Sequence, residues 1–196
     1  MSKPLPHTPL EAQAREARTA LDEPAPFSIV TTPMDDEWKR RFDEMYPTID
    51  VLPAAREGTL SPEERRGLAA KRQRLVDGLL RFGGERVCLP AWEADLDAIL
   101  ERGRLFSPEG LVRRRGRTGE CHANTAMLWR GSKGRIAIAT GYYLSGDGMW
   151  RPHSWGLADT GGSCLRVVET TEPAVAYFGF VLDASEACLF AEANDF

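Results

Sequence analysis

The chain has 196 residues, a formal net charge of −4 at pH 7, and a composition that is 42% hydrophobic and 28% charged. This composition is typical of a globular domain large enough to bury a core. Nucleic-acid-binding proteins usually carry an excess of basic residues, so the net negative charge argues against that class. No segment approaches the roughly 20 apolar residues that span a bilayer, and the N-terminal segment lacks the apolar stretch of a secretion signal. We therefore expect a soluble cytoplasmic protein that binds neither nucleic acid nor membrane.

The first half of the chain carries mainly helical patterns. Residues 1–33 are rich in proline, alanine and charged residues, which predicts a flexible N-terminal segment, with a short helix over 11–21 as an alternative. The sequence Ser61-Pro62-Glu63-Glu64 is a capping box with proline at the first helical position, and it opens a long helix. We expect helices over 35–46, 61–82 and 91–102 and a short extended piece over 86–89.

The second half changes to a pattern of one helix followed by strands. A basic, glycine-punctuated loop leads into a helix over 121–130 that ends at Gly131. Strands are predicted over 135–143, 149–158, 164–170 and 175–182, and glycine or proline marks each junction. We therefore expect an α+β fold in which residues 34–196 form one domain. Its helical part is 34–106, and its core is 107–196, where a helix packs on an antiparallel meander.

The cysteines are candidates for reactive thiols. Cys88, Cys121, Cys164 and Cys188 form no C-x-x-C pair, so we expect free thiols in a reducing compartment. Cys121 opens a predicted helix, where unpaired N–H groups and the positive end of the helix dipole favour the thiolate. The alternative is that Cys121 is a small packing residue, as many free cysteines are.

A base and an acid for this thiol can be sought among the strands. His7 lies in the N-terminal segment, and His122 is adjacent to Cys121 on a helix, where neighbouring side chains do not face each other. His153 remains, on the predicted strand 149–158. If Ala158 pairs with Cys164 across the glycine-rich turn, His153 lies directly opposite Glu169. A register slip of one residue would move Glu169 to the other face.

Five short motifs in this order resemble the transglutaminase-like group of the papain-like cysteine hydrolases over about residues 117–182. The motifs are Gly119-Glu120-Cys121, Ala126 with Arg130, Gly141-Tyr142, His153-Ser154-Trp155, and Val167-Val168-Glu169-Thr170-Thr171. The resemblance implies a papain-like fold with Cys121 as nucleophile, His153 as base and Glu169 in the place of the usual aspartate. It implies a thioester enzyme but does not choose among cysteine protease, amidase, deamidase, acyltransferase and crosslinking enzyme.

The expected activity is a thiol-dependent hydrolase or acyltransferase that acts on an amide carbonyl of a peptide or protein through a thioester with Cys121. Trp155, which shares the face of His153, is a candidate to contact substrate or to shield the pair from water. Arg117, with Arg113, Arg114 and Arg115, could attract an acidic substrate or form a solvated basic loop. We expect no cofactor and no metal, because Cys121, His122 and His153 lack a recognised metal-ligand spacing. A non-catalytic interaction module on a papain-like scaffold, and arylamine-type acetyl transfer, remain alternatives.

Overall fold

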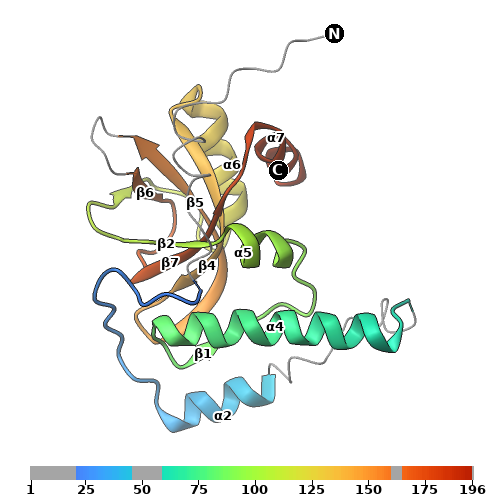
Figure 1. Cartoon of the computed structure of the whole chain (residues 1–196). Helices are drawn as coiled ribbons and strands as arrows, with labels where there is room; N and C mark the ends of the chain where they lie inside the picture. Colours follow the sequence, from blue (N-terminus) through green and yellow to red (C-terminus); the bar gives the residue numbers. More distant parts are fainter. Residues whose placement is uncertain (1–20, 46–58, 160–164, 196) are drawn as a thin grey trace.

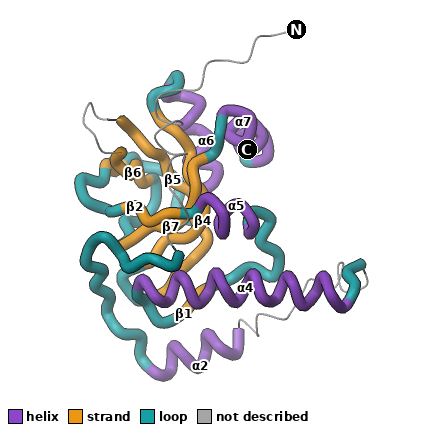
Figure 2. The backbone as a smooth tube through the Cα atoms, in the orientation of Figure 1, coloured by secondary structure: helices purple, strands orange, loops and turns teal. Residues whose placement is uncertain are grey.

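The computed structural model describes residues 21–45, 59–159 and 165–195, which form a mixed α+β structure (Figures 1 and 2). The α+β prediction is therefore confirmed at this level, whereas the alternative helix over 11–21 and Cys164 lie outside the described residues. In chain order the elements are α2 (Asp36–Met45), α4 (Pro62–Phe82), β1 (Arg86–Val87), α5 (Leu96–Arg102), β2 (Arg104–Phe106), β3 (Val112–Arg113), α6 (Cys121–Ser132), β4 (Ile136–Leu144), β5 (Met149–Asp159), β6 (Leu165–Glu169), β7 (Ala176–Val181) and α7 (Ala184–Ala193).

The strands form one mostly antiparallel sheet in the order β2-β7-β4-β5-β6-β3, and β1 pairs with β5. Strands β4, β5 and β6 are consecutive antiparallel neighbours, as expected. The expected meander is wrong at its last step, because β7 pairs with β4 instead of β6. The outer edge of β6 is occupied by β3, a short parallel strand from the basic loop.

The first half contributes strands as well as helices: β1 lies within the extended piece expected over 86–89, whereas β2 was not predicted. Strands β1 and β2 are two and three residues long, too short to show the alternation that predicts a strand. Helix α5 begins at Leu96, later than predicted, and α7 follows β7 where no helix was expected. The capping box of Asp183 and Glu186 is the sequence signal for α7. Cys188 lies on this helix and is exposed.

Helices α4 and α5 cover one face of the sheet. Leu75 and Leu79 of α4 and Ile99 of α5 are buried against sheet residues that include Phe178. The N-terminal segment joins this core: Leu21 is 1% exposed, and its side chain fills the space where a Cβ at Gly78 would lie. Ala25, Phe27 and Ile29 pack against the same cluster. Residues 21–29 are therefore attached to the core through these four side chains, which corrects the expectation of a flexible segment for that part, whereas Val30 is 75% exposed.

Among the described helices, none combines the length and the apolar character needed to cross a membrane.

Candidate active site

His153 and Glu169 lie on neighbouring strands and contact each other in the buried interior. The exposed fractions of their side chains are 3% and 0%, and His153 Nε2 is 2.9 Å from Glu169 Oε2. The register differs from the prediction, because Ala158 pairs with Arg166 and not with Cys164. A shift of two residues keeps every side chain on its face, so the two residues become diagonal neighbours on one face. The longer side chain of glutamate, compared with aspartate, suits this diagonal contact.

Glu169 is held by donors on both of its oxygen atoms. Oε1 accepts hydrogen bonds from the backbone N–H groups of Thr170 and Thr171, each at 2.8 Å, and from the Thr171 hydroxyl at 2.9 Å. Oε2 accepts from the Tyr177 hydroxyl at 2.9 Å, in addition to its contact with His153. Burial raises the pKa of the carboxyl, but His153 and these donors outweigh it, so the pKa of Glu169 is lowered. Glu169 therefore stays ionised and fixes the orientation of the imidazole.

Cys121 is the first residue of α6, whose N-terminus lies at an opening in the sheet. Strand β1 pairs with β5 at Met149 and Trp150, and β6 pairs with it from Gly156 onward. Between these points, within the described part of the chain, no strand pairs with residues 151–155 on that edge of β5. Helix α6 packs on β5 and β4. Its tip thus lies near His153, whose imidazole contributes to lowering the pKa of the half-buried Cys121 thiol.

The loop before Cys121 is fastened to both α6 and β6. Asn124, one turn into α6, donates to Arg117 O at 2.7 Å and accepts from Arg117 N at 2.9 Å. The N–H of Gly116 donates to Thr170 O at 2.9 Å. A Cβ at Gly116 would lie 2.6 Å from Asn124 and 2.7 Å from Thr170 O, so only glycine fits. Asn124 therefore positions the helix tip that carries the cysteine.

The thiol and the imidazole change each other's protonation. Burial raises the pKa of Cys121, but hydrogen-bonding contacts with His122 and His153 outweigh it and lower that pKa to about 5. Burial lowers the pKa of His153, but its hydrogen bonds with Cys121 and Glu169 raise it to about 9. Near neutral pH the two groups therefore exist as a thiolate and an imidazolium. Because Nε2 of His153 is engaged by Glu169, Nδ1 is the ring nitrogen that remains for the sulfur.

His122 is a second imidazole at the thiol, which corrects the argument that adjacent helical side chains exclude it. Its ring contacts the Cys121 thiol, and its Nδ1 lies 2.7 Å from Ser154 Oγ. The Ser154 hydroxyl donates to Thr140 Oγ1 at 3.0 Å, so its oxygen accepts a hydrogen bond from the Nδ1–H of His122. The rule that adjacent helical side chains do not face each other holds within a helix. Cys121 is the first residue of α6, and the imidazole of His122 is long enough to reach back to its thiol. No pattern in the sequence predicts this contact.

Aromatic rings surround His153 on its own face of the sheet. Its ring centroid lies 4.5 Å from that of Tyr143, 6.2 Å from that of Tyr177 and 6.3 Å from that of Trp155. Trp155 is completely buried, so it offers no surface to a substrate, contrary to one of its expected roles. Its place fits the other role, which is to exclude water from the His–Glu pair. Arg117 is exposed and forms an ion pair with Glu120 at 3.3 Å, and its role in substrate binding stays a prediction.

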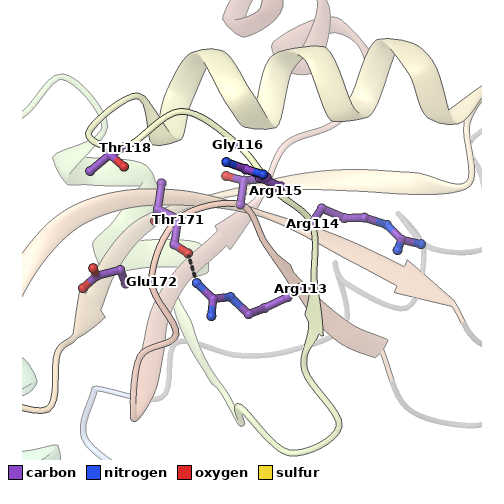
Figure 3. Close-up of a pocket in the computed structure, with 8 residues that line it drawn as sticks. Arg113, Arg114, Arg115, Gly116, Thr118, Thr171 and Glu172 are labelled. Atoms are coloured by element: carbon purple, nitrogen blue, oxygen red, sulfur yellow. Dashed lines mark hydrogen bonds between the residues drawn. The ribbon is translucent and has the colours of Figure 1, made fainter.

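A pocket of about 400 Å³ lies along the loop that precedes α6 (Figure 3). Three arginines, one glycine, three threonines and one glutamate line it: Arg113, Arg114, Arg115, Gly116, Thr118, Thr170, Thr171 and Glu172. Thr170 and Thr171 directly follow Glu169, and Thr118 lies three residues before Cys121. The pocket lining is thus close in sequence to both Glu169 and Cys121. Within the described residues, no cluster of three or more His, Cys, Asp or Glu side chains could hold a metal ion.

Comparisons with protein-family models, with curated proteins and with solved structures give no match. The site is therefore interpreted from its own geometry.

Proposed function

We propose that the protein is a thiol-dependent hydrolase or acyltransferase that acts on an amide carbonyl of a peptide or protein, with Cys121 as nucleophile on a papain-like core. One arrangement carries the proposal: Nε2 of His153 is held by the buried, ionised Glu169, and the imidazole lowers the pKa of the helix-tip thiol of Cys121. Such a chain of nucleophile, base and orienting acid activates a thiol for attack on carbonyl carbon. The pKa of Cys121, about 5, supports a thiolate at neutral pH without a separate deprotonation step.

The proposed reaction has two halves that share one thioester. The Cys121 thiolate forms a C–S bond to the carbonyl carbon. The C–N bond then breaks while the imidazolium of His153 gives its proton to the leaving amine. In the second half, neutral His153 takes a proton from water or from an acceptor amine, which attacks the thioester. The C–S bond breaks and the thiolate and imidazolium are restored.

The negative oxygen of each tetrahedral intermediate needs hydrogen-bond donors. The backbone N–H of Cys121 is suited to this, because the first N–H groups of a helix have no partner within the helix. His122 has a separate role in the proposal. Its imidazole shares the charge of the thiolate and is held in place by Ser154.

The proposal is tested by probe capture of Cys121. Wild-type protein and a His153→Ala variant are treated at pH 7 with alkyne-tagged acyl electrophiles of peptide type, and the modified peptides are identified by mass spectrometry. We expect capture at Cys121 in wild type, at least tenfold slower capture in His153→Ala, and none in Cys121→Ala. Thermal melting of each variant checks that it is folded.

Two results would count against an enzyme. Equal capture rates at Cys121 and at the exposed Cys188 would mean that the thiol is not activated. Equal rates for wild type and a folded His153→Ala variant would mean that the histidine does not serve the thiol. Either result would favour the non-catalytic interaction module.

A further inference from the structure

We propose that the arginine-lined pocket binds a carboxylate side chain of the peptide substrate, so that the protein acts on acidic segments. This inference rests on the proposed function, since it assigns the substrate class of the same site. It arises from the charge of the pocket, from an unpartnered hydroxyl in its wall and from its connection to Cys121.

The pocket has an excess of positive charge that the protein does not neutralise. Three of its lining residues are arginines and one, Glu172, is acidic. Arg113, Arg114 and Arg115 are all exposed. Within the described residues, none of the three forms an ion pair with a carboxylate. The Arg113 guanidinium donates only to a backbone carbonyl, Thr171 O, at 3.1 Å. Guanidinium groups without a protein partner are suited to bind a carboxylate in a two-pronged contact.

Two of the three arginines extend toward the same side of the chain. Figure 3 shows the side chains of Arg113 and Arg115 on the side where Thr171 lies, whereas the side chain of Arg114 extends away from it. This is the alternation of an extended backbone, and the N–H of Arg114 donates to Glu169 O at 2.8 Å. Arg113 and Arg115 therefore extend on the same side of this segment as Thr171, and Arg114 contributes only its charge.

A buried hydroxyl in the pocket wall has no partner. Thr170 is 5% exposed, and its Oγ1 is a buried atom without a hydrogen bond. Buried polar groups are nearly always satisfied, and an exception often marks a place where a ligand or water binds. The unsatisfied hydroxyl is a further polar feature of the wall, and the arginines of the lining point to an oxyanion as the ligand.

The position of the pocket relates it to the scissile bond. Thr118 precedes Cys121 by three residues, so chain connectivity keeps their Cα atoms within about 11 Å. An extended peptide advances about 3.3 Å per residue. A substrate carbonyl at Cys121 therefore places a residue within about three positions at the Thr118 end of the pocket. We infer a preference for Asp or Glu at such a position in the substrate.

The test uses the Cys121→Ala protein, which binds but cannot turn over. Fluorescently labelled peptides that carry a run of glutamates, and matched peptides with glutamine in their place, are titrated by fluorescence anisotropy at 50 mM and 500 mM salt. We expect the glutamate peptide to bind at least tenfold more tightly than the glutamine peptide, with a difference that shrinks at high salt. Inorganic phosphate is titrated alone and as a competitor, because it shares the oxyanion chemistry.

Matched arginine variants decide whether this pocket is responsible. Arg113→Gln and Arg115→Gln should each weaken binding of the glutamate peptide about tenfold or more, because a charged hydrogen bond is lost. Arg114→Gln removes the same charge at the neighbouring position and should weaken it less than threefold. Equal losses of affinity in all three variants would overturn the assignment of binding to this pocket. They would indicate only a general attraction by the basic loop. Equal binding of the two peptides, or binding of phosphate alone, would overturn the acidic substrate.

The outcome is independent of the catalytic proposal. If acidic peptides do not bind but Cys121 is captured in a His153-dependent way, the proposed activity stands and only the proposed substrate class is refuted. Acidic-peptide binding without capture would leave a binding module.

Discussion

The replacement Glu169→Gln tests the proposed charge arrangement with little change in shape. The amide oxygen can still accept the hydrogen bonds that the N–H groups of Thr170 and Thr171 now donate to Oε1. The amide nitrogen then faces His153 Nε2. An amide N–H needs an unprotonated Nε2 as acceptor. The variant therefore favours a neutral imidazole with its proton on the nitrogen that faces the sulfur. This is the wrong tautomer for a base, and it removes the cation that stabilises the thiolate.

The size of the effect follows from the pKa of Cys121. With a pKa of about 5, the thiol is about nine-tenths ionised at pH 6. An ordinary cysteine, with a pKa of about 8.5, is about 0.3% ionised at that pH, a roughly 300-fold smaller fraction. The less acidic thiol is roughly 25- to 55-fold more nucleophilic as thiolate, from a Brønsted slope of about 0.4–0.5. Alkylation at pH 6 should thus fall up to about tenfold, and at pH 9 it should rise. These are the largest changes expected, because His122 still contacts the sulfur.

The assay is iodoacetamide alkylation from pH 5 to pH 9, followed by peptide mass spectrometry, with the exposed Cys188 as an internal reference. The control Glu192→Gln makes the same charge change at an exposed position on α7. The opposite signs at pH 6 and pH 9 distinguish a change in pKa from a general loss of access. A Glu169→Gln profile that matches wild type at both pH values would refute the reasoning. Turnover of an identified substrate should fall by roughly 10³- to 10⁴-fold in this variant, by analogy with the aspartate of a serine-protease triad.

Three further outcomes follow from the site and its support. First, kcat/KM for an identified substrate should be bell-shaped with limbs near pH 5 and pH 9, because the thiolate forms above the pKa of Cys121 and the imidazolium is lost above that of His153. A flat profile across this range would contradict the ion pair. Second, Tyr177→Phe leaves the buried Glu169 with one donor fewer, and should lower the free energy of unfolding by about 1–3 kcal/mol in urea titrations. Third, Gly179→Ala should destabilise the fold by more than about 2 kcal/mol, since its Cβ would meet the backbone of β4. A wild-type melting temperature for that variant would contradict the close strand approach.

The sequence determined the local features of the site. The cysteine begins a helix as predicted, and Gly119, two residues before it, has a positive φ of 79° that favours glycine. The strands that carry His153 and Glu169 also lie within a residue or so of their predicted bounds. The alternation of side chains along a strand placed both residues on one face. The predicted register was wrong by two residues, but side chains repeat their face every two residues along a strand. The predicted face was therefore still correct.

Tertiary structure alone decided the remaining features. The position of β7 beside β4 and the pairing of the short strands β1, β2 and β3 depend on which sheet edges are free, and neighbours in the sequence do not encode that. The contact of His122 with the thiol depends on Ser154, which lies 32 residues away on β5. The arginine-lined pocket forms only because the loop before α6 lies along the end of β6. Local preferences act over a few residues, whereas register and contacts between distant segments are set by packing across the whole sheet.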